Sequence, residues 1–349
     1  MSGWRGWVGL ALVWVWLGGS AWGCSCLGHG PCWAATPHDA MFVGKVLSVT
    51  VTDRQLPSSF MRQRLYRIAV METFGGSQRV GEEVTVATGM GGGDCGYGLT
   101  IGQRYLVDAY KTKLGLETGI CSLTAPEDEA VATIRELRTV LLGGRLPDLS
   151  GRVATGPWIN ATVPSASLEG IAVTVTSDEG VKYQATTDGD GIYALATLPP
   201  GEYTVKAELP SRFTTYEASE KKAIQVKIPD AGGTGAACHA DVRALPSGHI
   251  PVRFVSGDGK PPDTLVSAYR LEQGQELAHK PVSYGAADGN GIFDVKFLPE
   301  GDYLLQVVLE LTDTNREAWY YPGVKSKAEA TAVHVEDGKA SAEVVFRIR

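Results

Sequence analysis

The sequence predicts an all-β protein built from three modules, and three observations lead to that prediction. Glycine (43) and proline (18) are abundant among the 349 residues, at about 17% together where average usage is about 12%. Short runs of alternating apolar and polar residues recur along the chain, as in half-buried strands. A motif at 188–203 returns at 288–303, one hundred residues later, which is about the size of a β-sandwich domain.

Residues 1–23 are predicted to be a secretory signal peptide. Arg5 is a short positive region, residues 6–19 are apolar, and Ala21-Trp22-Gly23 fits a small-x-small cleavage site. A permanent membrane anchor is the alternative, but the apolar run is shorter than the ~20 residues that a membrane span needs. The mature protein then begins at Cys24 and is secreted, periplasmic or held at the cell surface.

Composition and motifs exclude several classes of protein. The hydrophobic share of 44% argues against long disorder and several membrane spans, and the net charge of −7 without a basic stripe argues against nucleic-acid binding. We find no His-Glu-x-x-His and no Gly-x-Ser-x-Gly in the sequence. The prediction is therefore a non-enzymatic protein with no cofactor and no metal site.

Two glycine-rich segments resemble ligand-binding loops but favour structural roles. Asp188-Gly-Asp190-Gly lacks the glutamate that a calcium loop needs at its twelfth position, because residue 199 is proline. It is expected to be a tight turn. The segment 89–96 lacks the Lys-Ser/Thr of a phosphate-binding loop. Its glycines are expected to let backbones pack closely beside disulfides.

The first module, residues 24–145, is predicted to be a small β-barrel with one C-terminal helix. Strands are expected at residues 40–52, 65–73, 83–88 and 103–110, with a polar loop at 53–63. Thr124 and Glu127 suggest a capping box at the start of the helix. Apolar residues recur at helical spacing after it, and Gly143-Gly144 ends it.

All six cysteines follow the cleavage site: Cys24, Cys26, Cys32, Cys95, Cys121 and Cys238. An exported protein meets an oxidising compartment, so disulfides are the default expectation. Five of the six lie within residues 24–121, which predicts a stapled first module.

The motif Cys24-Ser25-Cys26, followed by Pro31-Cys32-Trp33 and the segment 39–46, resembles the netrin-like domain. It is most similar to the tissue inhibitors of metalloproteinases, over about residues 24–142. The resemblance implies an OB-type barrel with disulfides Cys24–Cys95 and Cys26–Cys121. Cys32 then lacks a partner inside the module, so either it pairs with Cys238 and fastens the first two modules together, or both thiols stay free.

The same resemblance implies a mechanism of inhibition. The amine and carbonyl of Cys24 would chelate the catalytic zinc of a metalloprotease, whose open coordination position is normally held by water. Ser25 would enter the specificity pocket of the protease, and residues 91–95 would lie beside the N-terminus. The leading hypothesis is therefore an exported binding protein that inhibits a zinc metalloprotease.

A different fate of Cys24 stays open. The segment Ala21-Trp22-Gly23-Cys24 also approximates a lipid-attachment site. A lipidated Cys24 would hold the protein at a membrane and could not chelate zinc through its amine.

Residues 150–245 and 247–349 resemble carboxypeptidase regulatory-like domains, which are small transthyretin-like, Ig-like β-sandwiches. The shared motif is Asp-Gly-x-Gly-Ile-aromatic followed by Leu-Pro-x-Gly-x-Tyr, in which Asp-Gly and Pro-Gly supply turns and the aromatics face the core. Strands are expected at residues 170–177, 203–209 and 340–349, with a joint at 245–248. The resemblance implies accessory modules without catalytic residues.

The alternative function is that of a cell-surface structural or adhesive protein with no inhibitory activity. Its partner would be an unidentified extracytoplasmic protein or a glycan. The aromatic cluster Trp319-Tyr320-Tyr321-Pro322 is either a contact surface for such a partner or a strand end packed on the sandwich.

Overall fold

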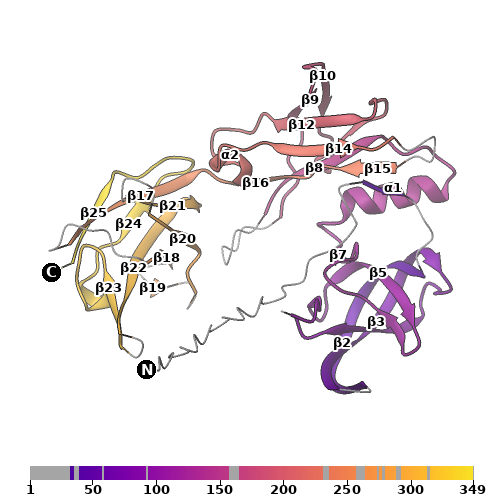
Figure 1. Cartoon of the computed structure of the whole chain (residues 1–349), viewed down its shortest axis with the longest axis horizontal. Coiled ribbons are helices and arrows are strands. Elements are labelled where there is room, and N and C mark those ends of the chain that lie inside the picture. The colour runs from indigo at the N-terminus through magenta and orange to yellow at the C-terminus, as the bar shows by residue number, and fades with distance from the viewer. Residues whose placement is uncertain are drawn as a thin grey trace, which may run out of the picture.

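The computed structural model describes residues 32–34, 39–56, 59–91, 93–156, 165–230, 236–256, 264–272, 275–276, 280–287, 292–312 and 315–348. It confirms the mostly β architecture. Figure 1 shows a barrel below the first sandwich, helix α1 between them, and the second sandwich at the opposite end of the molecule.

The barrel closes through a ring of paired strands. Strands β2, β3, β4, β6 and β5 form the ring in that order, and β5 pairs with β2 to close it. The β4–β6 pair is parallel and the other ring pairs are antiparallel. Its core holds Phe42, Ile68, Val86 and Val107, all fully buried. The strands are β2 (Ala40–Leu56), β3 (Ser59–Gly76), β4 (Glu83–Gly89), β5 (Arg104–Thr112), β6 (Gly115–Glu117) and β7 (Ala125–Pro126).

The polar loop expected at residues 53–63 is largely strand instead. Strands β2 and β3 continue as a hairpin in which Asp53 faces Arg62. Both residues are exposed, so their polar side chains need no desolvation in the strands. The prediction of a loop was wrong because polarity there reflects exposure rather than irregular backbone.

Helix α1 (Val131–Leu141) packs Ile134 and Leu137 against the barrel residues Met41 and Leu106. It ends as expected, with Gly143 at φ 72°. The capping box was wrong, because the helix begins at residue 131 and its N-cap makes no side-chain hydrogen bond.

The hydroxyl that was expected to cap the helix is used by the barrel. Thr124 is buried, and its Oγ1 donates to the carbonyl of Asp108 at 3.1 Å. This contact holds residue 124 on strand β5, several residues before the helix begins.

The first sandwich consists of two facing sheets around a core that includes Tyr193, Tyr203 and Val173. One sheet has the order β1-β15-β8-β16-β13 with β11 beside β8, and the other has the order β10-β9-β12-β14. A four-residue helix, α2 (Tyr216–Ser219), follows β13. The strands are β1 (Cys32–Ala34), β8 (Leu149–Thr155), β9 (Ala172–Ser177), β10 (Lys182–Thr186), β11 (Ile192–Leu195), β12 (Gly201–Ala207), β13 (Phe213–Thr214), β14 (Ile224–Ile228), β15 (Ala236–His239) and β16 (Val242–Pro246).

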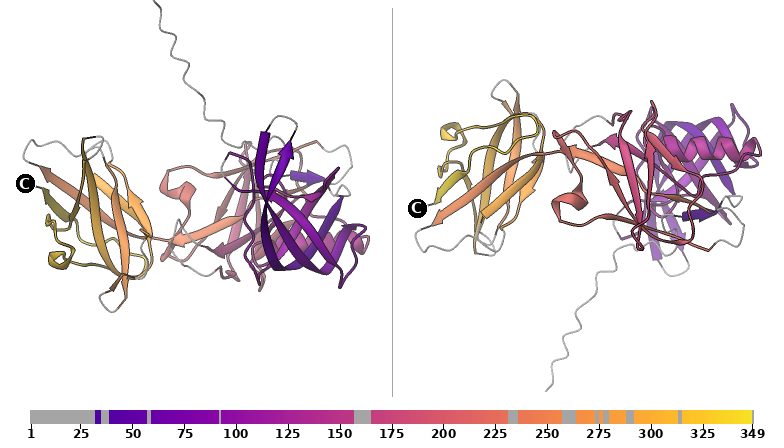
Figure 2. Two further views of the ribbon diagram at one scale, coloured as in Figure 1. Left: turned by 90° about the horizontal axis from the view of Figure 1, so that it is seen from below. Right: turned by 90° about the horizontal axis from the view of Figure 1, so that it is seen from above.

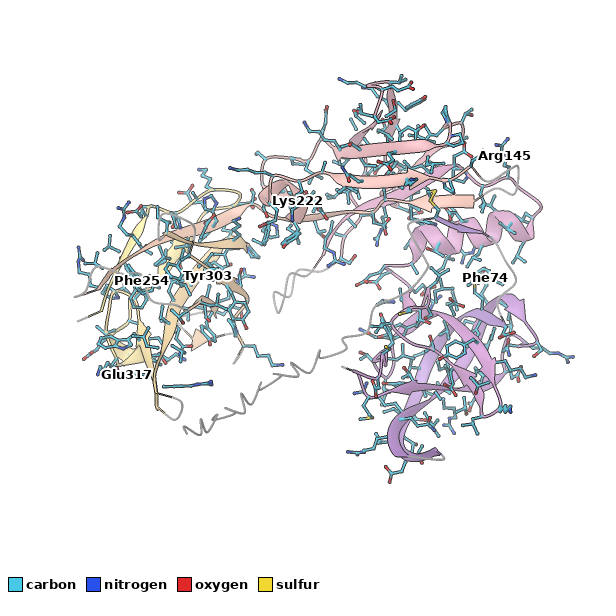
Figure 3. All side chains as sticks on the ribbon, in the orientation of Figure 1. Phe74, Arg145, Lys222, Phe254, Tyr303 and Glu317 are labelled. Carbon is cyan, nitrogen blue, oxygen red and sulfur yellow. A yellow bond between two sulfur atoms is a disulfide. The ribbon has the colours of Figure 1, made fainter. Side chains whose placement is uncertain are left out.

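The second sandwich repeats this two-layer plan. One sheet has the order β21-β17-β25, and the other has the order β19-β18-β22-β23 with β20 beside β18 and β24 beside β22. Figure 3 shows Phe254 and Tyr303 within this module. The elements are β17 (Gly248–Ser256), β18 (Val266–Glu272), β19 (Gln275–Glu276), β20 (Ser283–Gly285), β21 (Ile292–Leu298), β22 (Gly301–Thr312), β23 (Asn315–Tyr320), a 3-10 turn (Lys327–Glu329), β24 (Val333–Val335) and β25 (Val344–Ile348).

The repeated motif has the same internal contact in both copies. The Tyr203 hydroxyl donates to the carbonyl of Pro199 at 2.6 Å, and the Tyr303 hydroxyl donates to the carbonyl of Pro299 at 2.6 Å. Both tyrosines are buried. The repeat therefore marks two copies of one packing arrangement, as the sequence predicted.

Candidate functional site

The predicted inhibitory residues, Cys24 and Ser25, lie outside the described residues, as does Cys26. The structure does describe Cys95 and Cys121, and both are disulfide-bonded. They lie at one edge of the barrel, where the amide of Ile120 donates to the carbonyl of Cys95 at 3.0 Å. The pairings Cys24–Cys95 and Cys26–Cys121 remain predictions.

A cleft of about 460 Å³ opens at this edge and is lined by Cys95 and Cys121. Its charged lining residues are mostly acidic: one arginine, Arg62, and four carboxylates, Asp39, Asp94, Asp108 and Glu117. Nowhere in the described part of the chain do three or more His, Cys, Asp or Glu side chains gather closely enough to hold a metal ion. The cleft can therefore accept a polar segment of chain through hydrogen bonds and mixed charges.

The loop at residues 89–96 is shaped by one carboxylate. Asp94 accepts the backbone N–H groups of Met90, Gly91 and Gly96 at 2.6, 2.8 and 3.1 Å. Burial alone would raise the pKa of Asp94, but these hydrogen bonds outweigh it and lower that pKa. A side chain at Gly96 would meet the backbone of Gly89 at 2.2 Å, so this glycine is needed where two backbone segments touch beside Cys95.

A second site of interest is the contact between the barrel module and the first sandwich. Cys32 and Cys238 form a disulfide, which is one of the two outcomes that the sequence left open. Strand β1 carries Cys32 into the sheet of the sandwich, where it pairs antiparallel with β15. Figure 3 draws the bond in yellow within the first sandwich. Chain that precedes the barrel is thus fastened to the next module.

Helix α1 contributes an exposed ion-pair cluster to this contact. Arg135 bonds both Asp188 and Asp190 through separate guanidinium nitrogens. Asp188 also accepts the N–H groups of Asp190 and Ile192, each at 3.0 Å. The Asp-Gly-Asp-Gly segment is therefore a turn that the Asp188 side chain stabilises. Its two carboxylates form ion pairs with Arg135 of the helix.

The next residue of the helix supplies a buried carboxylate. Glu136, 5% exposed, accepts a hydrogen bond from Ser150 and lies 2.9 Å from Nε2 of His239. Burial alone would lower the pKa of His239, but the hydrogen bond and the charge of Glu136 outweigh it and raise that pKa. The barrel's helix and the sandwich therefore share a buried carboxylate–imidazole pair.

A buried arginine completes the contact from the sandwich side. Arg152, 8% exposed, bonds the carbonyl of Asp128, which precedes α1. It also donates to Ser167 at 2.9 Å and to the carbonyl of Asp190 at 3.3 Å. A buried guanidinium with several acceptors constrains the angle between the two modules.

The two sandwiches are joined through a single residue between β16 and β17, visible in both views of Figure 2 as the bridge between the modules. The amide of Ser247 donates to the carbonyl of Arg212 at 2.9 Å. Its hydroxyl hydrogen is shared between the carbonyls of Ser211 at 2.7 Å and Gly338 at 3.2 Å. Residues 211 and 212 belong to the first sandwich and Gly338 to the second. The linker is therefore bonded to both of its neighbours.

One family comparison locates a known domain in this chain. The carboxypeptidase regulatory-like domain matches residues 159–234, within the first sandwich, as the sequence motif predicted. No curated protein matches the chain in sequence. No helix in the described residues is both long and apolar enough to cross a membrane.

Solved structures match this chain only at low similarity. The minor pilin GBS52 of Streptococcus agalactiae has a TM-score of 0.24 and 17% identity, over 57% of this chain and 94% of that chain. The Bacillus anthracis TIE protein has a TM-score of 0.24 and 16% identity, over 88% of this chain and 47% of that chain. The major pilin BcpA of Bacillus cereus has a TM-score of 0.21 and 8% identity, over 57% and 98%. Scores at this level carry no functional conclusion.

Proposed function

We propose that this chain is an extracytoplasmic, non-enzymatic structural protein whose barrel and two sandwiches form one rigid tandem. The observation that supports the proposal is that specific bonds hold the modules together at both junctions. The first has the Cys32–Cys238 disulfide and the buried Glu136–His239 pair. The second has a one-residue linker bonded on both sides. Modules that need to move independently would be joined by longer, unbonded linkers.

The cysteines and the N-terminal segment both support an extracytoplasmic location. A disulfide between modules persists in an oxidising compartment, and the predicted signal peptide would deliver the chain there. A rigid spacer at the cell surface is the role that suits these features.

Small-angle X-ray scattering of the mature, oxidised chain tests the tandem directly. The expected result is a curve fitted by a single arrangement of the modules, with the same maximum dimension at low and high salt. A curve that requires an ensemble of open and closed arrangements would refute the proposal. Arg152→Met serves as a comparison, because it removes buried bonds of the first junction and should broaden the distribution of module distances.

Metalloprotease inhibition is the second candidate, favoured by one observation. Cys95 and Cys121 lie together at a cleft and are both disulfide-bonded, which suits a tethered N-terminal segment. In that case the mature chain inhibits at least one member of a panel of zinc metalloproteases.

Adding one residue before Cys24 should abolish this inhibition, because the α-amine would no longer stand beside the Cys24 carbonyl. A control chain with the same residue added at the C-terminus should keep full potency. Undiminished potency of the N-terminal variant would eliminate chelation by Cys24.

A further inference from the structure

The centre of the outer face of the larger sheet in the second sandwich is uncharged and carries three tyrosines. Residues alternate along β18, β22 and β23, so those that do not enter the core point outward. Across the strands, Tyr284, Ser267, Gln306 and Tyr320 form one row in register. The neighbouring outward positions are Leu265, Tyr269, Val308 and Ala318, together with Leu304, which is only 4% exposed.

Packing of the fold does not account for this composition. The inner positions, including Val266, Leu305 and Val307, already fill the core. The outward face of an antiparallel sheet is usually polar when it meets solvent. Here Tyr284 is 39% exposed and Val308 is 36% exposed. An exposed face of this kind marks an interaction surface.

Hydrogen bonds within the face hold two of its rings in place. The Tyr269 hydroxyl donates to Oε1 of Gln306 at 2.9 Å, and Nε2 of Gln306 donates to the Tyr320 hydroxyl at 3.0 Å. Tyr269 on β18 and Tyr320 on β23 are thus both hydrogen-bonded to the side-chain amide of Gln306 on β22, the strand between them. Side chains fixed before binding lose little conformational freedom when a ligand arrives.

The geometry points to a binding site for a neutral oligosaccharide on this face. The apolar face of a sugar ring packs on a tyrosine ring, while its hydroxyl groups exchange hydrogen bonds with Ser267, Gln306 and the tyrosine hydroxyls. The row crosses four strands and spans about 14 Å at the usual strand spacing, so several sugar units fit along it.

The charges of the face select against other ligands. None of the nine outward residues named above is charged. Charged residues of the same face lie toward its ends, with Asp302 2.8 Å from His334 at one end and the exposed Arg316 beyond Ala318 at the other. Nucleic acids and acidic peptides need unpaired cations. Protein interfaces tend to have an apolar centre with aromatic anchors, whereas the centre here is an amide and a serine hydroxyl. This ligand is additional to the rigid tandem and does not depend on it.

Affinity electrophoresis of the mature chain tests the site. Native gels containing β-glucan, xylan, galactomannan or dextran are compared with plain gels. We expect at least one neutral polysaccharide to retard the chain. Tyr284→Ala and Gln306→Ala should each weaken the binding by about 3- to 10-fold. Tyr110→Ala, which removes an exposed tyrosine from the barrel (52% exposed), should leave it unchanged.

Circular dichroism establishes that each variant is folded before binding is compared. The inference is overturned if none of the four polysaccharides retards the chain, or if Tyr284→Ala and Tyr110→Ala behave alike. Dimerisation in analytical ultracentrifugation that Tyr284→Ala abolishes would also overturn it, because the face would then belong to a second copy of the chain.

Discussion

Removing the disulfide between the first two modules should destabilise them together. The perturbation is the double variant Cys32→Ala/Cys238→Ala. Cys238 is fully buried, and alanine keeps its site apolar without leaving a reactive thiol. Strand β1 would keep its backbone pairing with β15.

The expected loss follows from the length of chain that the bond closes. The cysteines are 206 residues apart, which corresponds to about 5 kcal/mol in the chain-entropy treatment. If Cys26 is bonded to Cys121 as the resemblance implies, the effective loop shortens to roughly 120 residues. The expected loss of unfolding free energy stays at about 5 kcal/mol, because it depends only logarithmically on the length of the loop.

Guanidinium unfolding of the oxidised mature chain, followed by circular dichroism and tryptophan fluorescence, measures this loss. We expect the first major transition of the double variant to lose about 5 kcal/mol. Arg135→Ala is the control, because its ion pairs at the same junction are exposed and should be worth less than about 1 kcal/mol.

A loss below about 1 kcal/mol in the double variant would refute the reasoning. Separate transitions for barrel and sandwich in the wild type, with the crosslink intact, would do the same. Either result would mean that the bond fastens only the short strand β1, and that the modules unfold independently.

Three further predictions concern single residues. The raised pKa of His239 means that its pair with Glu136 adds stability fully present below about pH 6.5 and lost as pH rises through the folded pKa. Glu136→Gln should remove most of that pH dependence of the denaturation midpoint, and an unchanged profile would contradict the pairing. Asp94→Asn should lower the free energy of unfolding by about 1–3 kcal/mol above about pH 4. Because the pKa of Asp94 is lowered, this difference should vanish as pH falls through the folded value, as acid titration of stability would reveal. Gly338 has a φ of 72°, and a Cβ at this position would lie 2.5 Å from the Cα of Arg212. Gly338→Ala should therefore destabilise the second junction by more than about 1 kcal/mol. Proteolysis no faster than in the wild type would count against this contact.

Local patterns in the sequence were sufficient to predict the modules and most of the barrel strands. Alternation at residues 65–73 identified a strand because one face of that strand enters the barrel core. The strand predicted at 103–110 is buried on both faces, because Val107 enters the barrel core and Leu106 packs against α1. The same reasoning failed at residues 53–63, because Asp53 and Arg62 are exposed polar strand residues and their polarity suggested a loop. It also failed at the start of α1, where Thr124 has the side chain of a cap but bonds Asp108 across the barrel.

The candidate sites also include features that the sequence predicted and features that it did not. The regulatory-like motif predicted the turn at Asp188, since turn chemistry is local. It did not predict that Arg135 binds that turn, because an arginine on a helix surface shows no preference for a distant carboxylate in sequence. The outward tyrosines of the second sandwich were equally hidden, apart from the aromatic run at residues 319–322. Of that run, Trp319 packs inward while Tyr320 faces outward.

The sequence by itself determined the all-β composition, the repeated sandwich motif and the end of helix α1 at Gly143. Each of these depends on residues close together along the chain, where periodicity and turn geometry act directly. Only the tertiary structure decided that Cys32 bonds Cys238 and that Glu136 is buried against His239. Those contacts join segments more than one hundred residues apart, and such pairings depend on how whole modules pack rather than on local propensity.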